Sequence, residues 1–136
     1  MPAAPHEFRA RAQGRRGGVN GRGAEAEERA ARFLEAAGYE ILARNWACPM
    51  GELDIVARKG PAVVFVEVRS RSGSAYGSPA ETVTAAKRGR IIRTAQAYLK
   101  AARPQAEEYR FDFIGIVPGA APEHIENAFG ADGFGF

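Results

Sequence analysis

The succession of helix and strand patterns in this 136-residue chain predicts an α/β fold, in which a mixed sheet of four to five strands is flanked by helices. Three observations support this prediction. The patterns follow the order α-β-β-β-α-β, a short turn joins two neighbouring strand segments, and a helix separates those strands from the next one. Because a short turn joins antiparallel strands and a helical crossover allows parallel ones, both pairings are expected in one sheet. The length is that of a single domain.

The first helix is predicted over residues 25–37. Its small and apolar side chains recur at the spacing that places them on one helical face, and they are Ala26, Ala30, Phe33, Leu34 and Ala37. Gly38 follows directly and provides a C-terminal stop signal. The folded part of the chain is therefore expected to begin with an amphipathic helix.

Three strands are predicted next, over residues 39–47, 51–57 and 62–68. The first is rich in strand-forming residues, the second alternates apolar and polar residues, and the third is almost continuously apolar and β-branched. The segment Lys59-Gly60-Pro61 has the composition of a turn. The second and third strands are therefore expected to form a hairpin.

A loop is predicted over residues 70–79, followed by a helix over residues 81–102. The apolar side chains of this helix fall on one arc of ~120°. Cations lie on the opposite side, at Arg90, Arg93 and Lys100. We expect the helix to cover the sheet with its apolar side. A fourth strand is predicted over residues 109–117 and a short fifth one over residues 124–128.

Charge is distributed unevenly along the chain. Residues 1–22 carry five arginines and one glutamate, a net charge of +4, so the rest of the chain carries −1 of the total of +3. We expect a basic flexible tail over residues 1–22, a folded domain over residues 23–128 and a C-terminal tail over residues 129–136. The basic tail could neutralise nucleic-acid phosphates, or it could be a solvated segment without a dedicated partner.

The composition favours a soluble cytoplasmic protein. No segment approaches the roughly 20 apolar residues that cross a bilayer, and the N-terminus lacks the apolar stretch of a secretory signal. The single cysteine, Cys48, cannot form a disulfide within the chain. We therefore expect no membrane partner.

A glutamate, Glu67, lies inside one of the most apolar segments of the chain. Burying a carboxylate is costly without a partner, which is expected to be a basic side chain or a divalent cation. The second case would make this a metal-dependent active site. Because strand side chains alternate between two faces, Glu67 and Arg69 point the same way. On the preceding strand, Asp54 shares its face with Glu52 and Val56.

Whether Asp54 and Glu67 meet depends on the turn between their strands. A four-residue loop over residues 59–62 would place the two directly across from each other, with Cβ atoms ~4.5–5.5 Å apart. A two-residue loop is expected to shift the match by one pair and keep the face. A three-residue loop would put the carboxylates on opposite faces.

Two carboxylates this close repel each other unless a cation neutralises them. Mg²⁺ accepts one or two carboxylates plus waters and leaves positions for a phosphate, as metal-assisted phosphodiester hydrolysis requires. Arg69 could then hold the phosphate. The alternative is a partly buried, purely structural ion pair of Arg69 with Glu67 or Asp54. The spacing by itself leaves both interpretations open.

Four motifs in a fixed order add a family resemblance. They are Glu27-x-x-Ala30-Ala31-x-x-Leu34 running into Gly38-Tyr39, then Arg44-Asn45-Trp46, then Gly51-Glu52-Leu53-Asp54-Ile55-Val56, and then Phe65-Val66-Glu67-Val68-Arg69-Ser70-Arg71. From about Gly23 to Ile116 the chain resembles the YraN-like family of small bacterial proteins. That family is regarded as related to archaeal Holliday-junction resolvases within the PD-(D/E)xK nuclease superfamily. Lys87 and the segment Arg110-Phe111-Asp112 also belong to the resemblance.

The resemblance implies a restriction-endonuclease-like core with Asp54 and Glu67 as ligands of Mg²⁺ or Mn²⁺. It adds Glu27, from the first helix, as a third carboxylate near the metal. The catalytic lysine of the superfamily falls on Arg69, which stays protonated and cannot act as a general base, but can clamp a phosphate. Without the resemblance, Glu27 would be interpreted as an exposed glutamate in the first turn of a helix.

Nucleic-acid contacts are expected from cations of the loop and the second helix, at Arg71, Lys87, Arg90 and Arg93. The alternative is that the charged outer face of this helix is only solvated. The same resemblance implies that DNA is the partner.

The leading interpretation is a metal-dependent endonuclease-like protein that hydrolyses phosphodiesters of DNA, with branched DNA as one candidate substrate. The alternative is a non-catalytic nucleic-acid-binding module on the same fold, and a third is a protein–protein adaptor with an ion-paired sheet. Loss of cleavage on metal removal would separate the first from the second. Symmetric cleavage of a junction would require a homodimer.

Overall fold

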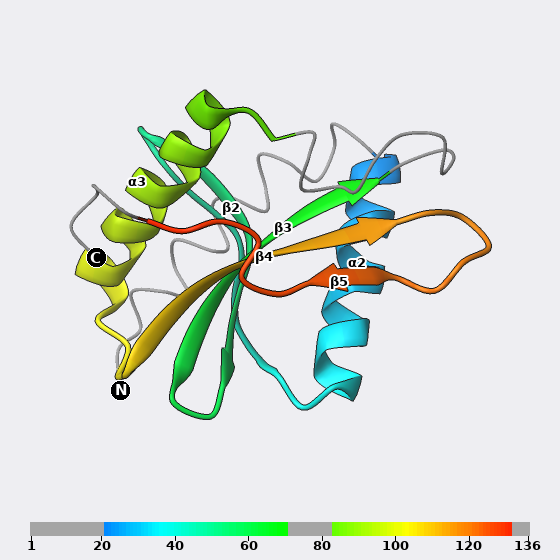
Figure 1. The fold of residues 1–136 in the computed structure, drawn as a ribbon, viewed down its shortest axis with the longest axis horizontal. Helices are drawn as coiled ribbons and strands as arrows, with labels where there is room; N and C mark the ends of the chain where they lie inside the picture. The colour runs from blue at the N-terminus through cyan, green and yellow to red at the C-terminus, as the bar shows by residue number, and fades with distance from the viewer. Residues whose placement is uncertain (1–20, 71–82, 132–136) are drawn as a thin grey trace.

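The computed structural model describes residues 21–70 and 83–131, which form a five-stranded sheet with a helix on each face (Figure 1). The strands lie in chain order across the sheet, and they are β1 (Glu40–Cys48), β2 (Gly51–Lys59), β3 (Ala62–Ser70), β4 (Glu108–Ile116) and β5 (Glu123–Ile125). The pair β3–β4 is parallel, and the other three pairs are antiparallel. This confirms the predicted mixed sheet. The expected tails lie largely outside the described residues.

The first helix, α2 (Gly21–Ala36), covers one face of the sheet. It begins four residues before the predicted start, and Gly38, with φ +96°, ends it as expected. Three apolar positions of the predicted pattern pack against inward-facing residues of β2, β3 and β4, namely Ala26, Ala30 and Leu34. One core layer thus lies between α2 and the sheet.

The second helix, α3 (Ala85–Ala102), covers the opposite face (Figure 1). Its buried side includes Ile91, Ile92, Ala95 and Tyr98, as the helical periodicity predicts. Its start differs from the prediction: Thr84 is in extended conformation, and its side chain accepts a hydrogen bond from the Lys87 N–H. Because an N-cap residue is not itself helical, the helix begins one residue after Thr84 rather than at residue 81.

The hairpin of β2 and β3 has a two-residue turn, Gly60-Pro61, closed by the pair Lys59↔Ala62. The prediction that such a turn would shift the match by one pair is wrong. Shortening the loop by one residue at each end adds a pair and leaves the register unchanged, so Ile55 still opposes Val66. The paired register ends there, one residue before Asp54 on β2 and Glu67 on β3.

The last strand, β5, ends at Ile125, three residues before its predicted end. Asn127 has φ +56°, and its N–H donates a hydrogen bond to the side chain of Asp112. The left-handed conformation ends the regular pairing with β4, although the N–H of Ala128 still donates to the backbone oxygen of Phe111. In residues 21–70 and 83–131 there is no helix with the length and apolar character needed to cross a membrane.

Candidate functional site

A pocket of about 230 Å³ lies where β2 and β3 meet the N-terminal half of α3. Four residues that the sequence singled out line it together: Asp54, Glu67, Lys87 and Arg90. The remaining lining residues are Gly51, Glu52, Ile91 and Thr94. Strands supply the carboxylates and the helix supplies the cations, so the pocket has an acidic side and a basic side.

Asp54 of β2 lies opposite a left-handed residue of β1. Asn45 has φ +53°, and the pairs on either side of it, Arg44↔Ile55 and Trp46↔Leu53, place it opposite Asp54. A left-handed residue interrupts the pleat of a strand. Leu53 and Val56 consequently both pack in the core layer beneath α3, although they are three residues apart. The predicted face of Asp54 is confirmed, because Asp54 and Glu52 line the pocket beside α3 and Val56 packs beneath the same helix, whereas Leu53 departs from the alternation.

The side chain of Asp54 is held by β3. Its Oδ2 accepts a hydrogen bond of 2.9 Å from the backbone N–H of Val68. The paired ladder between β2 and β3 ends at Ile55↔Val66, so this carboxylate takes over as acceptor where the two backbones separate. The contact fixes Asp54 next to the residue that follows Glu67.

Glu67 has a basic partner. Its side chain is 10% exposed, and its Oε2 lies 3.0 Å from the Nζ of Lys87 on α3. The sequence predicts a basic side chain or a metal beside this carboxylate, with Arg69 as the basic candidate. The structure brings Lys87 there instead, because α3 packs over β2 and β1 and its first turn reaches Glu67 of β3.

Arg69 does not line the pocket. Its Nε is buried and has no hydrogen-bond partner within the described part of the chain. The structural ion pair of Arg69 with Glu67 or Asp54, which the spacing left open, is not formed among the described residues. Arg71 lies outside them.

Glu27 is 5% exposed in α2 and is not a lining residue of the pocket. Its burial excludes the interpretation as an exposed glutamate in a first helical turn. Among the described residues no group of three or more His, Cys, Asp or Glu side chains is arranged to hold a metal ion. Glu27 therefore does not form a three-carboxylate group with Asp54 and Glu67 in this structure.

The donors in the pocket fit a divalent cation in type and number. Mg²⁺ binds to one or two carboxylates and keeps several waters, and Asp54 and Glu67 are two carboxylates in one pocket. Glu52 adds a third carboxylate to the lining. The need of Glu67 for a positive neighbour is shown by the ammonium of Lys87 beside it.

The helix above the pocket is strongly basic. Along α3 there are five cations and no carboxylate: Lys87, Arg88, Arg90, Arg93 and Lys100. Arg90 and Arg93 are exposed, whereas Arg88 donates to the backbone oxygen of Val83 with its Nη1. A row of cations on one helix is the electrostatic arrangement that attracts a phosphate backbone.

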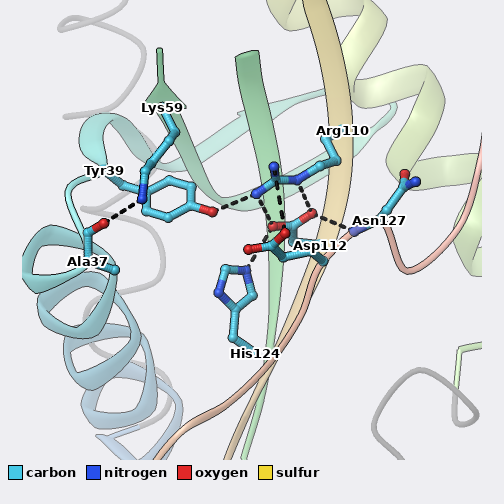
Figure 2. Close-up of polar contacts among 8 residues, drawn as sticks. Ala37, Tyr39, Lys59, Arg110, Asp112, His124 and Asn127 are labelled. Atoms are coloured by element: carbon cyan, nitrogen blue, oxygen red, sulfur yellow. Dashed lines mark hydrogen bonds and ion pairs between the residues drawn. The ribbon is translucent and has the colours of Figure 1, made fainter. Parts of the chain in front are cut away.

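A second polar cluster lies on the α2 side of the sheet, and Figure 2 shows it around Asp112 of β4. This carboxylate is fully buried. It accepts hydrogen bonds from Arg110 (2.9 and 2.8 Å), from the N–H of Asn127 (2.9 Å) and pairs with His124 Nε2 (2.8 Å). Arg110 also donates to the hydroxyl of Tyr39. The cluster ties β4 to β5 and to the start of β1.

The electrostatics of this cluster follow from its burial. Burial by itself raises the pKa of Asp112, but hydrogen bonds from His124, Arg110 and Asn127 outweigh it and hold the pKa below its usual range. The hydrogen bond to Asp112 raises the pKa of Arg110 further. The sequence analysis assigned no role to Asp112 or His124. The signal that could have found this site is the one used for Glu67, a carboxylate inside an apolar strand.

Comparisons with known proteins place this chain among similar bacterial sequences. A family model described as "Uncharacterised protein family UPF0102" matches residues 26–116, from α2 to the end of β4. A UPF0102 protein of Nocardia farcinica is 46% identical over 111 residues, covering 79% of this chain and 87% of the relative. One from Myxococcus xanthus is 44% identical over 112 residues, covering 80% and 89%. One from Symbiobacterium thermophilum is 43% identical over 113 residues, covering 80% and 96%.

Proposed function

The chain belongs to the uncharacterised protein family UPF0102, the YraN-like family of the resemblance, and on that premise we propose that it is a metal-dependent endonuclease-like protein. Its reaction would be the hydrolysis of DNA phosphodiesters, with branched DNA as one candidate substrate. The observation that carries the proposal is the pocket in which Asp54 and Glu67 face the cations of α3.

In this proposal Asp54 and Glu67 hold Mg²⁺ or Mn²⁺. The bound ion would polarise a phosphoryl oxygen and make water a better nucleophile near neutral pH. The N–H of Val68 keeps the Asp54 carboxylate oriented through its Oδ2. Because Glu27 does not line the pocket, its role would be to support the fold behind the site rather than to contact the ion.

The DNA backbone would lie along α3. Arg90 lines the pocket and is exposed, and Arg93 is exposed one turn further along the helix. Such cations contribute sequence-independent affinity through release of counterions. Arg69 would contribute positive charge at the end of β3, outside the pocket lining. A cytoplasmic location and a homodimer on a symmetric junction are parts of the same proposal.

A second candidate function is a nucleic-acid-binding module without catalysis. The ion pair between Lys87 and Glu67 favours it, because an ammonium already neutralises the carboxylate that a metal would need. Such a module would bind DNA in a salt-dependent way through α3 and would be insensitive to chelators.

The test is an Asp54→Asn variant studied by Mn²⁺ calorimetry and by cleavage of duplex and four-way-junction DNA. Asparagine retains an acceptor for the N–H of Val68, whereas alanine would also remove that hydrogen bond. Glu35→Gln is the matched control, since Glu35 is an exposed carboxylate of α2. We expect the variant to lose Mn²⁺ binding and cleavage and the control to keep both.

Two results would speak against a nuclease. If wild-type protein binds DNA but shows neither Mn²⁺ binding nor cleavage, the binding module is the better description. Cleavage that persists in Asp54→Asn or in excess chelator would place the activity outside this pocket.

A further inference from the structure

The cation nearest to the acidic side of the pocket is Lys87, and its position is well defined. It lies in the first turn of α3, where its N–H donates a hydrogen bond of 3.1 Å to the Thr84 hydroxyl. From there its Nζ reaches Glu67 at 3.0 Å. The lysine side chain is 34% exposed and the glutamate side chain 10% exposed. The pair thus joins an almost buried carboxylate to an ammonium that solvent still reaches.

The position of Lys87 on its helix affects the energy of this contact. A cation in the first turn of a helix is disfavoured by the helix dipole. The first turn of α3 contains no acidic residue that would offset this. The compensating charge is Glu67, on a different element. The two groups therefore depend on each other, and any second cation at Glu67 competes with the ammonium.

The long side chain of Lys87 allows a change of partner. Its ammonium is one compact charge on four rotatable carbons, so it can leave Glu67 without movement of the helix. Arg90 lines the same pocket one turn later and is exposed. An ammonium that leaves Glu67 would remain beside Arg90, on the basic side of the pocket.

We infer that Lys87 exchanges between two partners: it neutralises Glu67 in the metal-free protein, and when a divalent cation is bound it contacts a phosphate oxygen of the nucleic acid. The inference rests on the proposed function and names the residue that couples its two binding events. It assigns to Lys87, rather than to Arg69, the positive charge closest to the metal ligands.

The exchange has a consequence that a simple backbone contact lacks. If the ammonium competes for Glu67, then removing it strengthens binding of the divalent cation. One neighbouring charge within about 4–6 Å changes the pKa of a carboxylate by ~1–3 units. A divalent cation competes with the ammonium for the same carboxylate, so we expect Lys87→Met to bind Mn²⁺ roughly tenfold or more tightly. The same variant should lose cleavage, because no ammonium is left for the phosphate.

The experiment compares wild type with Lys87→Met and with Arg32→Met, which removes an exposed cation from the other helix, α2. Mn²⁺ affinity is measured by calorimetry, and the rise in melting temperature on Mn²⁺ addition gives a second readout that needs no substrate. Cleavage of four-way-junction DNA is measured on the same samples. Lys87→Met should show tighter Mn²⁺ binding, a larger rise in melting temperature and loss of cleavage. Arg32→Met should behave as wild type.

Wild-type protein that binds Mn²⁺ and cleaves, with no tighter binding in Lys87→Met, would overturn the inference and leave the proposed function intact. Tighter binding with cleavage retained would overturn the contact to phosphate. Absence of Mn²⁺ binding and cleavage in wild type would overturn the proposed function, and the inference with it. If Lys87→Met does not fold, Lys87→Gln serves in the same comparison, and Lys87→Arg, which keeps the charge, should restore the wild-type Mn²⁺ affinity.

Discussion

Replacing Asp112 by asparagine is expected to destabilise the protein strongly. The carboxylate is fully buried and accepts from both Arg110 and the N–H of Asn127. Asparagine carries no negative charge, and its amide NH₂ is a donor that would face the N–H donors of Arg110 and Asn127. Breaking one partner of a buried pair costs about 3–5 kcal/mol. Because the Arg110 side chain is 21% exposed and water can partly solvate it, we expect the lower end, about 3 kcal/mol.

A loss of about 3 kcal/mol is a large part of the 5–15 kcal/mol that is typical of a domain. For a chain of this length it corresponds to a fall of roughly 10 °C in melting temperature. The assay is urea denaturation at pH 7. Glu108→Gln, at the exposed start of the same strand, is the matched control and should change stability by less than about 0.5 kcal/mol.

The pH dependence provides a second check. The pKa of Asp112 is lowered in the folded protein, so between the folded value and the unfolded value of about 3.9 the unfolded state binds more protons. Stability from this group is therefore complete above about pH 4–5 and is lost as the pH falls through the folded pKa. The difference between wild type and Asp112→Asn should shrink as the pH falls below 4. A difference under about 1 kcal/mol at pH 7, or one that stays unchanged down to pH 3, would refute this account of the cluster.

Two further predictions concern the pocket and the basic helix. In Gly51→Ala the new Cβ would lie 2.9 Å from the Thr94 hydroxyl, so we expect a loss of about 1–3 kcal/mol in thermal unfolding. Gly130→Ala, where a Cβ meets nothing within 4 Å, should be close to neutral, and equal stability of the two variants would contradict the close approach of β2 to α3. In Arg93→Gln the slope of log affinity for DNA against log salt should fall by about 1. The same charge change at Arg32, exposed on α2, should leave the slope unaltered, and identical slopes for the two variants would mean that DNA does not lie along α3.

The local elements followed from the sequence because their signals are local. Helical periodicity identified the buried side of α3, and the turn Gly60-Pro61 identified the hairpin. Each depends on residues that are near one another in the chain, so side-chain spacing and backbone preference are enough. The charged residue in an apolar strand was also visible, and it indicated that Glu67 needed a positive partner.

The identity of that partner depended on tertiary structure. Arg69 is only two residues from Glu67, yet Lys87 makes the contact, because α3 packs over β2 and β1 and its first turn reaches Glu67. The left-handed backbone at Asn45, opposite Asp54, is likewise invisible to a pattern of alternation.

The sequence by itself therefore determined the elements, the mixed sheet and the two carboxylates of the candidate site. Only the tertiary structure decided which cation meets Glu67, why Glu27 lies away from the pocket, and that Asp112 gathers Arg110 and His124 from two strands. The physical reason is that hydrophobic packing sets where a helix lies on a sheet, and hydrophobic attraction is not directional. Ion pairs and hydrogen bonds need contact within a few ångströms, so their partners are chosen only after that packing has brought distant segments together.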